Sequence, residues 1–154
     1  GNLAHLVRGL YAHSDVRPPA LTESWLATLA SQLLSALSYA HDVAGVAHRD
    51  MKPENVLLFG PVGLSATELV TRPAHALLCD FGLAGIFNSK DAGESTGLHM
   101  NLPAVDATAR GTPPYMSPEI FKGQFTEKSD MWSLGVVLFQ LMTGKLPYSG
   151  DSLM

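Results

Sequence analysis

An acid, an amine and an amide side chain lie close together in this sequence, at Asp50, Lys52 and Asn55. A second carboxylate, Asp80, follows a short apolar run further along the chain. Phosphoryl transfer asks for little covalent chemistry from a protein, because the main tasks are to neutralise the nucleotide's charge, hold a metal ion and orient the acceptor hydroxyl. Carboxylates, an amide and a fixed cation can do this, so these residue types suit phosphoryl transfer.

The candidate metal ligands are Asn55 and Asp80. Mg²⁺ prefers hard oxygen ligands and keeps several waters, so these two side chains and the phosphates of a nucleotide would form a sufficient set. The sequence has no Cys/His set that would favour zinc. Its one cysteine, Cys79, has no partner for an intramolecular disulfide, which favours a reducing compartment. We therefore expect an intracellular protein, cytoplasmic or nuclear.

Composition excludes several other classes of protein. The 154 residues are 46% hydrophobic and 16% charged, which is enough for one moderate core. A formal net charge of −4 gives no electrostatic footprint for nucleic acid, and no Lys/Arg cluster suggests a membrane surface. No apolar stretch approaches the roughly 20 residues that a membrane span needs. We expect neither nucleic acid nor membrane as a partner.

The elements that must position the site can be read from apolar periodicity. Residues 2–11 and 22–44 have the spacing of amphipathic helices, and the second begins with the helix-start residues Thr22 and Glu23. Residues 130–142 are apolar nearly all round, which predicts a helix buried in the middle of a core.

The remaining segments are shorter or irregular. Residues 76–79 predict a brief strand that delivers Asp80 to the site. Residues 59–76 contain several Gly and Pro and predict a surface insertion, and residues 88–110 predict a long loop. The sequence shows no internal repeat.

Three motifs in this order resemble the catalytic domain of a eukaryotic protein kinase. They are His48-Arg49-Asp50-Met51-Lys52-Pro53-Glu54-Asn55, Asp80-Phe81-Gly82 and Ser117-Pro118-Glu119. The resemblance implies an α+β, mainly α-helical fold: most of a kinase C-terminal lobe, with short β-strands around the catalytic loop. It implies that residues 1–154 are a partial kinase domain, with the N-terminal lobe expected upstream and the final helices absent.

The resemblance also assigns the catalytic roles. Asp50 would orient the substrate hydroxyl or accept its proton, and Lys52 would neutralise the transferring phosphoryl group. Asn55 and Asp80 would hold Mg²⁺ with ATP. A lysine two positions after the catalytic aspartate is typical of the Ser/Thr branch. Thr112 lies in a segment similar to the peptide-binding loop, where its hydroxyl would bond the catalytic aspartate and lysine.

Further positions resemble nucleotide-site and scaffold residues. Leu57 would form the floor of the adenine pocket, Cys79 its rear, and Asn2 would meet the ribose. Glu54 is assigned to the same nucleotide site and could also attract a basic residue of the peptide. The structural residues implied by the resemblance are His48, Phe81, Gly82, Glu119 and Asp130. His48 and Phe81 would stack in an apolar column, and Asp130 would anchor the catalytic loop. The other five histidines, His41 among them, are interpreted as surface or satisfied residues without a role.

Regulation by phosphorylation is a hypothesis that rests on Arg49. In many kinases the equivalent arginine pairs with a phosphate on the activation loop. Thr108 lies where that phosphate is often carried, and Ser95 and Thr96 are weaker candidates. Gly85 departs from the pattern, because a second basic residue often stands there.

Three function classes stay open. The first is a segment of an ATP-dependent Ser/Thr protein kinase with a protein substrate, the second a non-catalytic kinase-like scaffold, and the third an inactive product of a truncated gene. We expect this chain by itself to be inactive, because the ATP-covering lobe would precede Gly1. We also expect it to be marginally stable, because residues 130–142 would lack part of their covering. We also expect Glu119 to lack its usual arginine partner, which would lie beyond Met154.

Overall fold

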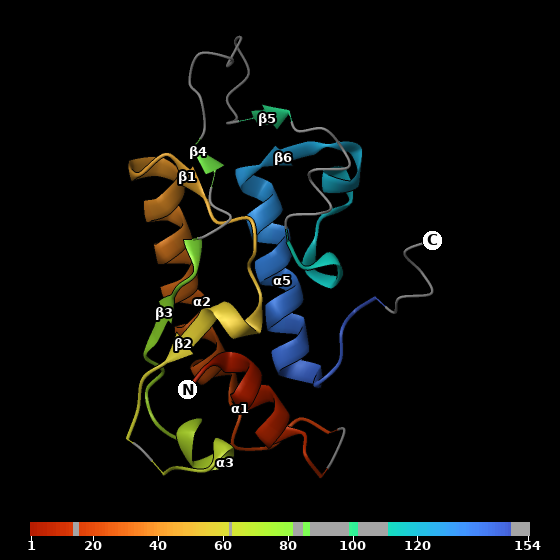
Figure 1. The fold of residues 1–154 in the computed structure, drawn as a ribbon. Helices are drawn as coiled ribbons and strands as arrows, with labels where there is room; N and C mark the ends of the chain where they lie inside the picture. Colours follow the sequence, from red (N-terminus) through yellow and green to blue (C-terminus); the bar gives the residue numbers. More distant parts are fainter. Residues whose placement is uncertain (14–15, 62, 82–84, 87–98, 102–110, 149–154) are drawn as a thin grey trace.

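The computed structural model describes residues 1–13, 16–61, 63–81, 85–86, 99–101 and 111–148. Its α-helices are α1 (Leu3–Leu10), α2 (Glu23–Ser38), α3 (Ala66–Leu69) and α5 (Glu127–Thr143) (Figure 1). Shorter helical turns occur as a π-helix at Tyr39–Val43 and as 3₁₀ turns at Pro53–Asn55, Pro113–Tyr115 and Pro118–Lys122. The expected mainly helical α+β class is confirmed.

The strands are short and pair two by two in the described part of the chain. They are β1 (Val46–Ala47), β2 (Val56–Leu58), β3 (Ala76–Leu78), β4 (Gly85–Ile86), β5 (His99–Asn101) and β6 (Gln124–Thr126). Antiparallel pairs form between β1 and β4, β2 and β3, and β5 and β6. Strands β1 and β2 directly flank the loop of residues 48–55, and their partners β4 and β3 both come later in the sequence. The two pairs fix where this loop begins and ends.

Helix α1 confirms the periodicity of residues 2–11. Its apolar stripe is buried, and it consists of Leu3, Leu6, Val7 and Leu10. The Asn2 side chain caps the helix by accepting a hydrogen bond from the backbone N–H of His5 at 3.0 Å.

Helix α2 begins as predicted and ends differently. The hydroxyl of Thr22 accepts the backbone N–H of Trp25 at 3.2 Å, an N-cap that starts the helix. At Tyr39 the regular α-helix gives way to the π-helix, which the periodicity does not reveal. Two apolar residues within the predicted helix of residues 22–44, Leu34 and Tyr39, are exposed.

Helix α5 is capped at both ends. Thr126 accepts the N–H of Lys128 at 3.2 Å, and the Ser129 hydroxyl accepts the N–H of Thr126 at 3.3 Å. Gly144 ends the helix with φ 73°, in the left-handed region that favours glycine. A Cβ there would also lie 2.6 Å from the ring of Tyr11, so glycine permits the close approach of the two segments.

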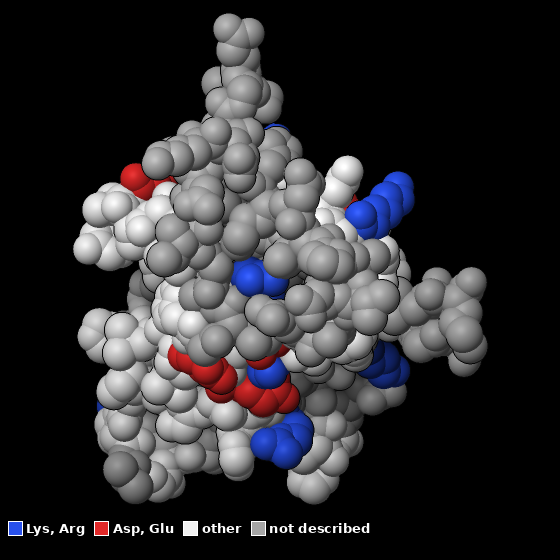
Figure 2. Space-filling model, turned by 45° about the horizontal axis from the view of Figure 1, so that its top comes forward, with Lys and Arg blue, Asp and Glu red and all other residues white. Residues whose placement is uncertain are grey.

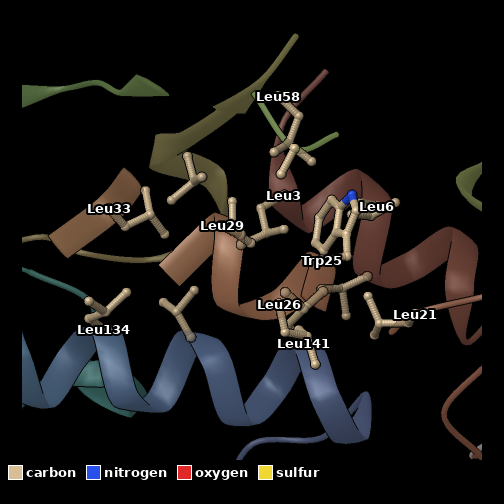
Figure 3. Close-up of a cluster of buried hydrophobic side chains, with 14 of the residues drawn as sticks. Leu3, Leu6, Leu21, Trp25, Leu26, Leu29, Leu33, Leu58, Leu134 and Leu141 are labelled. Atoms are coloured by element: carbon tan, nitrogen blue, oxygen red, sulfur yellow. The ribbon is translucent and has the colours of Figure 1, made fainter. Parts of the chain in front are cut away.

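The core lies between α5, α2 and α1. Leu134 and Leu141 of α5 point toward leucines of α2, with Leu3 and Leu6 of α1 above them (Figure 3). The prediction that residues 130–142 are buried all round is wrong for one face. Four large apolar side chains on α5 are 37–43% exposed: Met131, Trp132, Phe139 and Met142.

Two irregular segments contain more structure than their composition indicates. Residues 88–110 include strand β5, which pairs with β6 directly before α5. The insertion at 59–76 includes helix α3, started by Ser65, whose hydroxyl accepts the N–H of Glu68 at 3.3 Å. In addition, none of the helices in the described part has the length and apolar character needed to cross a membrane.

Candidate functional site

The loop of residues 48–55, the catalytic loop of the kinase resemblance, is held in place by one buried carboxylate. Asp130, 1% exposed in the first turn of α5, accepts the backbone N–H of His48 at 2.8 Å and that of Arg49 at 2.9 Å. Arg49 has φ 70°, a left-handed conformation that is costly for a residue with a side chain. The two hydrogen bonds stabilise this conformation, which sets the direction in which the next residue, Asp50, leaves the backbone.

Asp130 has a third partner that the sequence interpretation missed. The ring Nε2 of His41 lies 2.8 Å from Asp130 Oδ2, and both side chains are buried. His41 sits in the π-helix, where the change of helical phase sets the direction of its ring. Because that phase change is invisible in apolar periodicity, no local signal distinguishes His41 from a surface histidine.

Asp50, Lys52 and Thr112 form a closed set of hydrogen bonds. Lys52 Nζ donates to Asp50 Oδ2 at 2.6 Å and to Thr112 Oγ1 at 3.1 Å, and Thr112 Oγ1 donates to Asp50 Oδ1 at 2.8 Å. Asp50 is 8% exposed, so its charge is largely withdrawn from water and stabilised by these donors. The structure thus brings together the three residues to which the resemblance gives catalytic roles.

Asn55 closes the other side of the loop. Its Nδ2 donates to the backbone oxygen of Asp50 at 2.8 Å and to Asp50 Oδ2 at 3.3 Å, which leaves the amide oxygen Oδ1 to act as a ligand. The backbone N–H of Cys79 donates to the backbone oxygen of Asn55 at 2.9 Å, so Asp80 follows directly after a residue bonded to Asn55.

The donor set around Asn55 and Asp80 fits magnesium. Both side chains offer hard oxygens, Asp80 is exposed, and its φ of 64° turns the chain at that point. The described residues contain no group of three His, Cys, Asp or Glu side chains that could hold a metal ion alone. A metal ion here would therefore need further oxygens, which the phosphates of a nucleotide could supply.

His48 links the catalytic loop to the Asp80 turn. Its Nε2 lies 2.9 Å from the backbone oxygen of Cys79, and the N–H of Asp50 donates to its Nδ1 at 3.3 Å. Since Nδ1 accepts a hydrogen bond, we assign the proton of the neutral ring to Nε2. The rings of His48 and Phe81 have centroids 4.6 Å apart, so the structure places the two expected members of the apolar column in contact.

The expected nucleotide-site residues are distributed over two strands and a helix cap. Leu57 lies in β2 and is paired with Asn2 through an isolated β-bridge. The Cys79 thiol donates to the backbone oxygen of Asn55 at 3.3 Å, and burial together with the nearby Asp80 charge raises the pKa of that thiol. Asn2 lines a groove of about 440 Å³ between α1 and residues 60–69. Asp50 is not among the residues that line this groove.

Glu54 acts electrostatically on the segment that resembles the peptide-binding loop. It is exposed, and its negative charge acts on Tyr115, which follows Thr112 by three positions. Burial first, and then this charge, raises the pKa of Tyr115 to about 12. The Tyr115 hydroxyl donates to Gln140 Oε1 at 2.7 Å. Near the centre of the face in Figure 2, acidic and basic side chains lie next to one another.

The carboxylate of Glu119 has a hydrogen-bond partner in this structure. The Ser129 hydroxyl donates to Glu119 Oε1 at 3.0 Å, so this carboxylate has a partner other than the arginine of the family pattern. Burial raises the pKa of Glu119, but hydrogen bonds to the carboxylate and the charge of Lys122 outweigh this, so the pKa lies below its ordinary value. Ser129 was missed because only the fold brings the first turn of α5 to this segment.

Some expected residues fall outside the described part of the chain. Gly82, Ser95, Thr96 and Thr108 are among them. Gly85 is described through its backbone, where it begins β4 and pairs with Ala47.

Comparison with known families decides the assignment of the chain. Residues 3–154 match the family model described as the protein kinase domain. The chain belongs to the protein kinase family. Members of this family in general use ATP and Mg²⁺ and act on proteins.

Several curated kinases are similar to this segment. It is 39% identical to the serine/threonine-protein kinase CHK1 of Saccharomyces cerevisiae, over 79% of this chain and 20% of that protein. It is 42% identical to the serine/threonine-protein kinase pkn3 of Myxococcus xanthus, over 86% of this chain and 21% of that protein. A third relative, calcium-dependent protein kinase 6 of Plasmodium berghei, is 34% identical over 88% of this chain and 8% of that protein. The kinase segment thus spans about a fifth or less of the length of these three relatives.

Proposed function

We propose that this segment carries the catalytic loop and peptide-binding part of an ATP- and Mg²⁺-dependent protein serine/threonine kinase. The observation that carries the proposal is the placement of the Asp50 carboxylate, which accepts hydrogen bonds from Lys52 at 2.6 Å and from Thr112 at 2.8 Å. This arrangement fixes an acid, a cation and a hydroxyl around one small volume. The names of the first two relatives support the Ser/Thr assignment.

In this proposal Asp50 orients the acceptor hydroxyl and takes up its proton. The carboxylate is fixed on both oxygens, so it needs little reorganisation when a hydroxyl arrives. Lys52 places a positive charge beside it, which would stabilise the negative charge of a transferring phosphoryl group. Thr112 joins this pair to the peptide-binding segment, so binding of the peptide and orientation of Asp50 are linked.

Asn55 and Asp80 would hold Mg²⁺ in this proposal. Asn55 Oδ1 and the Asp80 carboxylate are the oxygens in question, and the phosphates of ATP would complete the ligand set. Bound Mg²⁺ would supply neutralisation of the phosphate charge. Leu57 and Cys79, on β2 and directly after β3, would border the adenine.

We also propose that residues 1–154 are a partial kinase domain that acts as the C-terminal lobe of a longer chain. The match to the kinase family begins at Leu3 and covers a small share of each relative. An upstream lobe would cover the nucleotide, and this segment would supply the residues below it.

The decisive experiment is replacement of Asp50 by Asn in the complete natural chain that contains this sequence. Transfer of radiolabelled phosphate from ATP to a serine-containing protein substrate should fall by about a thousandfold, in the range expected for loss of a positioned acid or base. Asp42→Asn is the matched control, because Asp42 is an exposed carboxylate that accepts a hydrogen bond from Ser38. Its activity should equal that of the wild type.

Two outcomes would refute the proposal. One is a wild-type chain without phosphoryl transfer in the presence of Mg²⁺ and ATP, which would favour the scaffold hypothesis. The other is an Asp50→Asn variant that keeps the wild-type rate.

A further inference from the structure

Phe125 lies where the catalytic loop meets the strand of residues 99–101. It is the middle residue of β6, is 4% exposed, and pairs with Met100 of β5. The guanidinium carbon of Arg49 lies 5.5 Å from the centroid of the Phe125 ring. The side chain of Phe125 therefore contacts the arginine of the catalytic loop, and the backbone of Phe125 belongs to the β5–β6 pair.

The position of Arg49 matters because its backbone is strained. Its φ of 70° is held on the backbone side by the hydrogen bond from its N–H to Asp130 Oδ1 at 2.9 Å. On the side-chain side, the guanidinium over the aromatic face makes a favourable cation–π contact, stronger where the ring is shielded from water. Arg49 is thus held from both ends, and Asp50 is the next residue in the chain.

Both restraints on Arg49 depend on the same short stretch of chain. Phe125 contacts the side chain, and the next residue, Thr126, caps the helix that carries Asp130. Strand β5 pairs with this stretch at all three of its positions, with Thr126 opposite His99. Loss of the pairing with β5 would therefore loosen the ring beneath Arg49 and the start of α5 together.

We propose that Phe125 is a positioning residue for phosphoryl transfer, which couples the pairing of β5 and β6 to the conformation of Arg49 and so to the orientation of Asp50. This inference rests on the proposed function. It assigns Arg49 a partner within the protein, in addition to any phosphate on the activation loop. The activation segment would then influence the site through a strand as well as through phosphorylation.

The test uses the complete natural chain, treated with phosphatase. Phe125→Leu removes the ring and keeps an apolar side chain, and Phe125→Tyr keeps the ring. We expect Phe125→Leu to lower kcat by about tenfold with KM for ATP and peptide within about twofold, and Phe125→Tyr to restore most of kcat. Leu10→Ala, which truncates a buried residue of α1, is the control for general destabilisation and should leave kcat unchanged.

A double-mutant cycle shows whether the ring acts through Arg49. Arg49→Met combined with Phe125→Leu should be no slower than Arg49→Met alone, because both changes remove the same contact. Losses that multiply would overturn the proposal, as would a Phe125→Leu variant with the wild-type kcat.

Hydrogen exchange gives a readout that does not depend on activity. Arg49→Met should speed amide exchange in residues 99–101 severalfold, because coupling between two sites is reciprocal. Because this measurement uses Arg49→Met, it remains possible if Phe125→Leu does not fold. Unchanged exchange of residues 99–101 in Arg49→Met would overturn the coupling. An inactive wild type would refute the proposed function, whereas an active wild type with normal Phe125→Leu kinetics would refute this inference alone.

Discussion

The carboxylate of Asp130 and the backbone N–H of Arg49 meet at 2.9 Å although 81 positions separate them in the sequence. The same carboxylate receives the N–H of His48 and lies 2.8 Å from Nε2 of His41. A buried carboxylate is tolerable only with such partners, because its charge is removed from water. The first turn of α5 and the start of the catalytic loop therefore form one structural unit.

Replacing Asp130 with Asn should destabilise the complete natural chain by about 3 kcal/mol, because an amide offers one accepting oxygen where the carboxylate offers two, and a buried N–H would lose its partner. Urea unfolding followed by circular dichroism measures the change. Asp42→Asn, which alters an exposed carboxylate on the π-helix, should change the free energy of unfolding by less than about 0.5 kcal/mol. Equal effects of the two substitutions would contradict the anchoring role of Asp130.

The hydroxyl of Thr112 can be tested apart from its bulk. Thr112→Val removes the donor to Asp50 Oδ1 and the acceptor from Lys52 Nζ, and it should lower kcat of the complete chain by about tenfold to a hundredfold. Thr112→Ser keeps the hydroxyl and should remain within about threefold of the wild type. The check is steady-state phosphoryl transfer to a serine peptide. Similar kinetics of the two variants would show that the hydroxyl bonds are dispensable.

Local signals predicted α1, α2 and α5, because each of these helices carries its own pattern. The stripe of α1, from Leu3 to Leu10, is buried as its spacing indicates. The start of α2 at Thr22 follows from its capping chemistry. The end of α5 at Gly144 follows from a left-handed position that suits glycine.

The features that the sequence did not reveal depend on contacts between distant segments. Strand β5 pairs with β6 over only three residues, which is too short for alternation of polar and apolar residues to predict a strand. His41 contacts Asp130 because a π-helix shifts its direction. The burial of α5 was overestimated because apolar composition does not say which neighbours cover each face, and Trp132 stands 37% exposed beside Tyr148. The catalytic contacts were expected from the resemblance to kinases, and no periodicity indicates them.

Tyr115 predicts a dependence of stability on alkaline pH. Burial and the charge of Glu54 raise its pKa from 10.0 in the unfolded chain to about 12 in the fold. A raised folded pKa gives stability that is complete below pH 10 and is lost as the pH rises to about 12. The difference in free energy of unfolding between wild type and Tyr115→Phe, measured from pH 9 to 12, should fall across that window. A difference that stays constant would mean that Tyr115 titrates normally.

Thr108, the expected phosphorylation site, lies outside the described residues and can be tested in the complete chain. A phosphate adds about −1.5 to −2 charges, which could pair with the guanidinium of Arg49. Because Gly85 stands where a second basic residue often helps, we expect a moderate effect. Thr108→Ala should lower kcat about tenfold relative to wild-type protein whose phosphorylation at Thr108 is established by tandem mass spectrometry of its peptides. Ser95→Ala tests one of the weaker candidates and should keep the wild-type rate if Thr108 carries the regulatory phosphate. Wild-type activity and unchanged amide exchange of the activation segment in Thr108→Ala would rule out this site as the regulatory one.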